Sequence, residues 1–320
     1  MRFSKLFSAL TILGCCTGLA AAQTYPSKPV TMVVPMAVGG ASDIMGRSVA
    51  QKLGDLWGQP VIVENRAGGT TTVGADHVAR ASADGYTMML AAPPFIITQF
   101  VYPNLKYSTT TSFEPVTLIA YYPLIMVVNA DLPIRNMKEL VEYARSHPGT
   151  AYPSPGAGTT PHLVGEMIAQ RENLQMVHVP YKSGGQAIVD LVAGRLQFYA
   201  GVPTEVVPSI QSGKLRAIAT LAAQRSALLP DVPTSGESGY GYVQAQSWSS
   251  IVMPKGTPRA IVDKVNADVR RIIEMPDMRD RLTAQGAVFV GSSPEKLAAF
   301  YQSERELYGP LVKSIGLKPD

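Results

Sequence analysis

Strand-like and helix-like stretches alternate along nearly the whole chain. Runs rich in β-branched and apolar residues, such as 30–34 (VTMVV) and 86–91 (YTMMLA), are followed by stretches with the apolar spacing of an α-helix. This alternation predicts an α/β fold in which helices cover parallel sheets. Residues 86–105 and 115–130 are long and uncharged, but Pro93-Pro94 interrupts the first and Pro123 the second. We therefore expect buried strands and loops there, not membrane spans.

Several helix starts are marked by local sequence. Asn136, with Glu139 three residues later, resembles a capping box and predicts a helix that reaches Arg145. Two later helices are expected to open at Thr257-Pro258 and at Ser293-Pro294, where a hydroxyl residue caps the helix and proline takes the first helical position.

The first 22 residues have the three parts of a secretory signal. Arg2 and Lys5 precede an uncharged stretch that ends in Ala20-Ala21-Ala22. We expect residues 1–22 to be a signal peptide and the mature protein to be periplasmic. A second reading is lipid attachment at Cys15, because Ile-Leu-Gly-Cys loosely resembles a lipoprotein box. Cleavage after Ala22 would remove both cysteines, which leaves no disulfide, thiolate nucleophile or Cys-ligated zinc.

The size and net charge of the chain further limit the classes of protein to which it can belong. A chain of 320 residues that is 46% apolar can bury a core large enough to divide into two lobes. The net charge of +4 is spread thinly and forms no basic run, which argues against a nucleic-acid binder. We expect a monomer.

A weak internal repeat is the sequence feature that says most about function. The glycine-containing segments 35–43 (PMAVGGASD) and 153–162 (PSPGAGTTPH) each precede a predicted helix and lie about 120 residues apart. A third segment, 181–185 (YKSGG), is placed in the same way. Alone, each is a common turn, but equivalent loops in two halves favour a ligand held between them.

These loops have the chemistry of an anion site. A helix N-terminus presents unpaired N–H groups and a partial positive charge, and glycine lets the backbone approach a ligand closely. Hydroxyl donors are added by Ser42, Thr159, Thr160 and Ser183. Lys182 is the one lysine within these loops, so a carboxylate is favoured over a polyphosphate.

Catalytic and metal-binding patterns are missing from the sequence. There is no nucleophile motif with a plausible base, and the four histidines lack metal-ligand spacing. We expect no catalytic residue, metal or cofactor. His162 is interpreted as a packing or capping residue that could instead face the cleft, Asp43 as complementing the helix dipole, and Trp248 as either a pocket wall or core.

At these motifs the chain resembles the substrate-binding proteins of tripartite tricarboxylate transporters (the Bug or TctC-like receptors). The resemblance runs from about Tyr25 to the C-terminus. It is carried, in order, by YPSKPVTMVVPMAVGGASDIMGR, GQPVIVENRAGG, ADGYTMML, GTTPHL, VPYKSGGQAIVDLVAGR, SGKLRAIAT, PDVPTSGESG and the tail from MPKGTP.

The resemblance implies a type II periplasmic binding fold, in which two α/β lobes joined by crossover strands close on a ligand. Lobe 1 would be discontinuous, covering 23–122 plus 245–320, and lobe 2 would cover 123–244. Crossovers are expected within Val116–Val128 and near Gln244–Trp248. The residues expected at the ligand are Ala37, Val38, Gly39, Gly40, Ser42, Asp43, Pro94, Phe95, Gly158, Thr159, Thr160, His162, Ser183, Gly184 and Val202.

Some residues depart from the family pattern. Phe95, Tyr199 and Val202 are hypothesised pocket walls, and they would favour an aromatic or long-chain acid. The expected function is capture of a small mono- or dicarboxylate for integral membrane transporter subunits. The alternatives are a periplasmic sensor that reports its ligand to a membrane receptor and an enzyme acting on a carboxylic acid.

Overall fold

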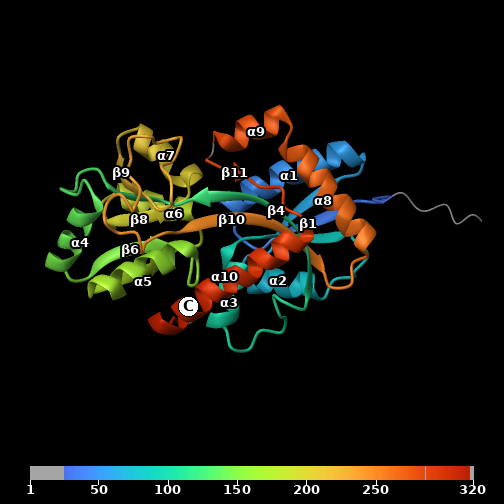
Figure 1. The fold of residues 1–320 in the computed structure, drawn as a ribbon, viewed down its shortest axis with the longest axis horizontal. Coiled ribbons are helices and arrows are strands. Elements are labelled where there is room, and N and C mark those ends of the chain that lie inside the picture. The colour runs from blue at the N-terminus through green and yellow to red at the C-terminus, as the bar shows by residue number, and fades with distance from the viewer. Residues whose placement is uncertain (1–24, 285, 318–320) are drawn as a thin grey trace, which may run out of the picture.

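The computed structural model describes residues 25–284 and 286–317 (Figure 1). The expected signal peptide, including Cys15, lies outside the described residues. The strands are β1 (Val30–Val34), β2 (Val61–Asn65), β3 (Thr87–Ala91), β4 (Phe113–Pro123), β5 (Ile125–Asn129), β6 (Thr150–Ser154), β7 (Met176–Pro180), β8 (Phe198–Gly201), β9 (Leu215–Thr220), β10 (Gln246–Pro254) and β11 (Val288–Phe289). The helices are α1 (Ala41–Trp57), α2 (Thr72–Ala79), α3 (Pro93–Val101), α4 (Met137–Ser146), α5 (Thr160–Glu172), α6 (Gly184–Val192), α7 (Pro203–Gln211), α8 (Arg259–Ile273), α9 (Pro276–Thr283) and α10 (Pro294–Ile315).

Three sheets organise the strands. A six-stranded sheet has the order β11-β4-β10-β3-β1-β2, a three-stranded sheet has the order β8-β5-β9, and β6 pairs with β7. The prediction of parallel pairing is correct for β1 with β2 and β3, and for β6 with β7. It is wrong for the rest, because β10 runs antiparallel to β3 and β4, and β5 runs antiparallel to β8 and β9. The pairing of β10 is long-range, and no local pattern could indicate its direction.

Two adjacent long strands connect the two larger sheets. β4 pairs with β10 along its length and continues through Leu124 into β5 of the three-stranded sheet. The backbone N–H of Leu124 donates to the carbonyl of Ala245, 3.3 Å away. The chain therefore leaves the six-stranded sheet after β4 and returns to it before β10 at adjacent points. In Figure 1, α4–α7 lie at one end of the molecule, α1, α8 and α9 lie at the other, and β4 and β10 run between them.

Amphipathic spacing explains how the helices dock. In α8, Val262, Val265, Val269 and Ile272 recur at three- and four-residue intervals and are all buried, on the side that packs against β4 and α1. By contrast, α3 is apolar almost all round and occupies a stretch for which strands and loops were expected. That prediction was wrong, because a helix buried on most sides has no polar face to reveal its period.

The predicted caps are mostly present. Asn136 accepts a hydrogen bond of 2.9 Å from the N–H of Glu139, and Ser293 accepts one of 3.3 Å from the N–H of Lys296. The helix expected to open at Thr257 starts one residue later, with Pro258 at the N-cap. The hydroxyl of Thr257 instead donates to the carbonyl of Pro254, 2.8 Å away, because the preceding turn offers it a nearby acceptor.

Candidate functional site

A cavity lies where the N-termini of five helices converge. It is lined by the starts of α1, α3, α5, α6 and α7, and by neighbouring strand ends. The lining residues are Met36, Ala37, Gly40, Ala41, Ser42, Ala92, Pro94, Leu124, Pro155, Thr159, Thr160, Pro161, Lys182, Ser183, Gly184, Tyr199, Val202, Glu205 and Ser247. Each helix brings the positive end of its dipole to the wall, so the cavity suits an anion.

The two helices that follow the repeated glycine-containing segments, α1 and α5, begin without side-chain caps. The N-cap of α1 is Gly40, which has no side chain, and that of α5 is Thr159, whose side chain accepts no hydrogen bond from its helix. First-turn N–H groups are the ones that intrahelical bonds leave unsatisfied. Ser42 and Thr160, in the first turns of these helices, line the cavity, while the hydroxyl of Thr159 donates to the Gly156 carbonyl, 2.8 Å away. The two loops therefore bring unsatisfied backbone N–H groups to the same cavity.

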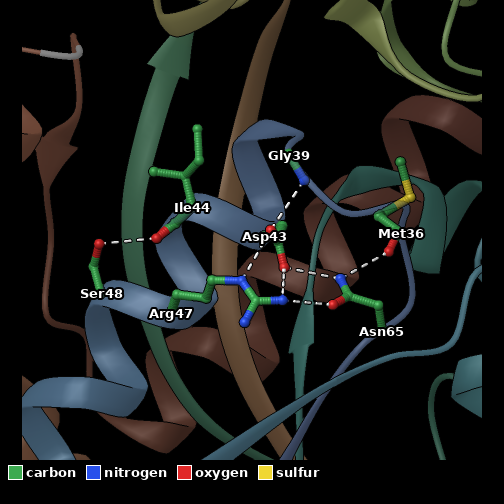
Figure 2. A network of polar contacts seen from close by, with 7 residues as sticks. All are labelled: Met36, Gly39, Asp43, Ile44, Arg47, Ser48 and Asn65. Atoms are coloured by element: carbon green, nitrogen blue, oxygen red, sulfur yellow. Dashed lines mark hydrogen bonds and ion pairs between the residues drawn. The ribbon is translucent and has the colours of Figure 1, made fainter.

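The loop before α1 is held in place by Asp43. Figure 2 shows this carboxylate between the Gly39 amide and the side chains of Arg47 and Asn65. Gly39 N and Arg47 Nε each donate to Oδ2 over 3.0 Å, and Asn65 Nδ2 donates to Oδ1 over 2.9 Å. Asn65 Nδ2 also donates to the Met36 carbonyl, 3.1 Å away. Burial acts to raise the pKa of Asp43, but the hydrogen bonds from Arg47, Gly39 and Asn65 outweigh it and lower the pKa.

The loop before α5 is held by a stacked histidine pair, of which His162 is buried and His178 half-buried. The rings of His162 and His178 stack with centroids 3.6 Å apart and planes 11° apart. The N–H of Gly158 donates to His162 Nδ1 over 3.3 Å, and Ser154 Oγ lies 2.6 Å from His178 Nε2. His162 is only 5% exposed. It supports the loop from behind, which fits the packing interpretation.

A half-buried acid, Glu205, stands on the side of the cavity built by α6 and α7. The Tyr199 hydroxyl donates to Glu205 Oε2 over 2.8 Å. The carboxyl group of Glu205 lies so close to Gly184 that a Cβ at that position would come within 2.3 Å of it. Burial raises the pKa of Glu205 to about 7, against the lowering effect of hydrogen bonds from Tyr199 and the Val202 backbone.

The structure brings nine of the fifteen expected residues to the cavity wall. They are Ala37, Gly40, Ser42, Pro94, Thr159, Thr160, Ser183, Gly184 and Val202. The other six are not in the lining. Val38 is 67% exposed, Gly39 and Gly158 lie within the supporting hydrogen-bond networks, and Asp43 and His162 act as described above.

Two aromatic side chains were considered as walls and belong to the core instead. Phe95 is fully buried and meets Phe113 edge-on at 5.0 Å between ring centroids. Trp248 is 1% exposed and donates from Nε1 to Glu304. Both contacts join distant parts of the chain, which one sequence does not reveal. Tyr199 and Val202 are in the lining, as hypothesised.

The sequence reasoning missed Glu205 and Ser247. A local signal for Glu205 existed, because Pro203 followed two residues later by an acid is a typical helix start. Ser247 carried no such signal, since its place in the wall depends on the pairing of β10 with β4.

The fold and the cavity are those of a periplasmic binding protein. The solved structure of periplasmic binding protein BugD matches with a TM-score of 0.86 at 33% identity, covering 92% of this chain and 100% of that chain. The structure of R. palustris Rpa4515 with adipate matches with a TM-score of 0.88 at 30% identity, with the same coverage.

Sequence comparison gives the family. The model described as tripartite tricarboxylate transporter family receptor matches residues 45–317. Protein BugT of Bordetella pertussis (strain Tohama I) is 32% identical over 324 residues, covering 99% of each chain. The chain therefore belongs to the tripartite tricarboxylate transporter receptor family, which confirms the resemblance. The family and these neighbours are binding proteins, not enzymes.

The described residues lack two features, a candidate metal site and a membrane-spanning helix. Across 25–284 and 286–317, no group of three or more His, Cys, Asp or Glu side chains is arranged to hold a metal ion. None of the helices in this part of the chain has both the length and the hydrophobicity needed to cross a bilayer.

Proposed function

We propose that this protein binds a small organic carboxylate in the five-helix cavity and delivers it, chemically unchanged, to integral membrane subunits of a tripartite tricarboxylate-type transporter. The observation that carries the proposal is that the N-termini of five helices converge on one cavity and that two of these helices, α1 and α5, lack a side-chain cap. A carboxylate placed there is stabilised by N–H donors and helix dipoles. In this proposal the protein acts in the periplasm after removal of residues 1–22, and it acts as a monomer.

The proposal includes two lobes that close on the ligand. Lobe 1 is residues 23–122 with 245–320, and lobe 2 is 123–244, joined where β4 and β10 meet β5. Support comes from the lining, because Ser42 belongs to the first part and Thr160 to the second. A cluster of buried side chains also spans the two parts, with Leu163 of α5 against Ile97 of α3 and Tyr308 of α10. Opening would separate this cluster, so it favours the closed form.

The apolar part of the wall bears on ligand choice. Met36, Pro94, Leu124, Tyr199 and Val202 line the cavity beside the polar donors. Such a wall suits the hydrocarbon part of an aromatic or longer-chain acid. The relative Rpa4515 with adipate supports an aliphatic diacid as the first compound to try.

A thermal-shift screen of mono- and dicarboxylates tests the binding step, because a ligand selective for the folded state raises the melting temperature. Each acid is paired with its neutral amide, for example adipate with adipamide. We expect a carboxylate to stabilise the protein and its amide to have no effect. Stabilisation by neutral sugars and by none of the acids would contradict the proposal.

The delivery step needs a separate experiment. Cells lacking this gene should lose uptake of the radiolabelled acid, and a plasmid copy should restore it. Normal uptake in the deletion strain would argue against a transport role.

A further inference from the structure

Glu205 places a carboxyl group in the wall of the proposed anion site. It stands in the first turn of α7, and it is one of two charged residues, with Lys182, among the described residues of the lining. Its Oε2 accepts the hydrogen bond from Tyr199, and its carboxyl group packs against Gly184. The hydroxyl of Tyr199 and the backbone N–H of Val202 hold the carboxyl group in place, and Glu205 still belongs to the cavity lining.

Among the described residues Glu205 accepts hydrogen bonds from the Tyr199 hydroxyl and the Val202 backbone, but no cation pairs with it. Tyr199 of β8 is neutral, and Lys182 is exposed and forms no ion pair with any described residue. The other cavity residues near this wall, Ser183 and Ser247, are uncharged.

Charged residues on the elements packed against α7 are engaged elsewhere. On α6, Asp190 pairs with Arg195 at 2.7 Å. On β9, Arg216 donates to backbone carbonyls of Ala130, Leu132 and Ile134. Within α1, across the cavity, Asp43 pairs with Arg47 at 3.0 Å. None of these groups is in the cavity lining.

This arrangement sets up a conflict of like charges. If a carboxylate binds at the helix N-termini while Glu205 is ionised, two anions share the wall of one cavity. Such pairs are relieved when one partner takes up a proton. A neutral carboxyl group can also donate a hydrogen bond to the ligand, whereas an ionised one only accepts.

We propose that Glu205 binds the ligand as its neutral acid, so that capture of a carboxylate takes up one proton from solvent onto the carboxyl group of Glu205. That proton is then donated in a hydrogen bond to an oxygen of the ligand. No other bond is made or broken. The inference rests on the proposed function and adds to it a residue that selects ligands with a hydrogen-bond acceptor at this wall.

Burial supports the protonation step. Because the pKa of Glu205 is already raised to about 7 without a ligand, a nearby anion needs only to raise it further. Above this pH, Glu205 is ionised in the free protein, and in our proposal it is neutral in the complex. Binding therefore takes up a proton in this pH range.

Calorimetric titration with adipate at pH 8, in buffers of different ionisation enthalpy, measures the protons taken up on binding. The carboxyl groups of adipate titrate well below this pH, so they do not contribute. We expect close to one proton per ligand in the wild type, and a Kd that weakens up to tenfold per pH unit above pH 7. Glu205→Gln should take up no proton and have a Kd independent of pH.

Glu304→Gln is the matched control, because it removes another glutamate whose pKa is raised to about 7, and this one lies outside the cavity. It should keep the proton uptake of the wild type. Uptake of no proton by the wild type overturns the inference even if the Glu205 variant does not fold. Uptake that persists in Glu205→Gln overturns it as well. Failure of every carboxylate to bind at any pH between about 5 and 9 is a different result, and it would overturn the proposed function itself.

Discussion

The indole Nε1 of Trp248 donates a hydrogen bond of 2.6 Å to Oε2 of Glu304, inside the core between β10 and α10. Glu304 is 6% exposed and has no ion pair among the described residues. Burial raises its pKa to about 7, although the hydrogen bond from Trp248 acts in the opposite direction. The folded protein therefore holds a proton that the unfolded chain releases near pH 4.5.

This difference makes stability depend on pH. As pH rises from about 4.5 to about 7, the unfolded chain ionises first, so the free energy of unfolding falls, by about 3 kcal/mol in all. Glu304→Gln removes the effect and still offers an oxygen to Trp248. In denaturant unfolding, the free energy of unfolding of the variant, relative to that of the wild type, should increase from about pH 4.5 to about pH 7. A difference between the two that stays constant with pH would contradict this assignment.

Gly184→Ala should displace Glu205. The added Cβ would lie 2.3 Å from the carboxyl group of Glu205, and relieving that overlap breaks the hydrogen bond from Tyr199. We expect a loss of about 1–3 kcal/mol in the free energy of unfolding.

The adjacent glycine is the control for this substitution. At Gly185 an added Cβ would find its nearest neighbour, Ser183 Oγ, at an ordinary 3.9 Å. Gly185→Ala should therefore leave stability unchanged or raise it slightly, because alanine favours a helix. Equal losses in the two variants would count against the contact with Glu205.

Asp43→Asn should weaken both folding and binding. An amide nitrogen cannot accept the hydrogen bonds that Gly39 and Arg47 now share on Oδ2, so the loop before α1 loses a fixed point. We expect the free energy of unfolding to fall by about 2 kcal/mol, measured by denaturant titration at pH 7. The Kd for the best-binding acid should rise about tenfold, measured by calorimetric titration at the same pH. Asp55→Asn, an exposed change in the same helix, should have neither effect.

The pH dependence of this variant has a defined sign. Because the pKa of Asp43 is lowered in the folded protein, its contribution to stability is fully present above about 3.8 and is lost as pH falls through the folded value. The stability gap between wild type and Asp43→Asn should thus be constant from about pH 5 to 8 and shrink in acid. A gap that widens in acid would be inconsistent with the hydrogen-bond network of Asp43.

Leu163→Ala tests whether the cluster between α3, α5 and α10 favours closure. Leu163 is 1% exposed, and truncation removes contacts that exist only when the two parts are together. We expect ligand affinity to fall about fivefold or more. Leu140→Ala, equally buried in α4 but outside that cluster, should lose stability without a matching loss of affinity.

Phe95→Leu separates a core role from a wall role. Phe95 packs on Phe113 and Tyr301 and is fully buried, so the variant should lose about 1–2 kcal/mol of stability. Its ranking of aliphatic against aromatic acids, measured by calorimetry, should match that of the wild type. A changed ranking would contradict the core assignment and would indicate that Phe95 contributes to ligand specificity.

Local chemistry accounts for what the sequence predicts well. Glycine and hydroxyl residues before a helical period mark helix starts, and three such starts, at Gly40, Thr159 and Ser183, do meet at one cavity. These signals lie within a few residues of each other, so a single chain displays them.

Long-range packing accounts for what the sequence does not predict. The stack of His162 on His178 and the contact of Glu205 with Gly184 join residues from different elements, with no periodic relation between them. The same holds for β10, whose antiparallel insertion between β3 and β4 depends on a pairing across more than a hundred residues.

The most direct test of the central claim is calorimetric titration of the purified protein with the best-stabilising acid and with its neutral amide. If main-chain donors at converging helix ends hold the ligand, the acid should bind with a micromolar or tighter Kd and the amide at least about a hundredfold more weakly, a gap of roughly 3 kcal/mol. Equal affinity for the two compounds would contradict the account, because the negative charge would then contribute nothing to recognition.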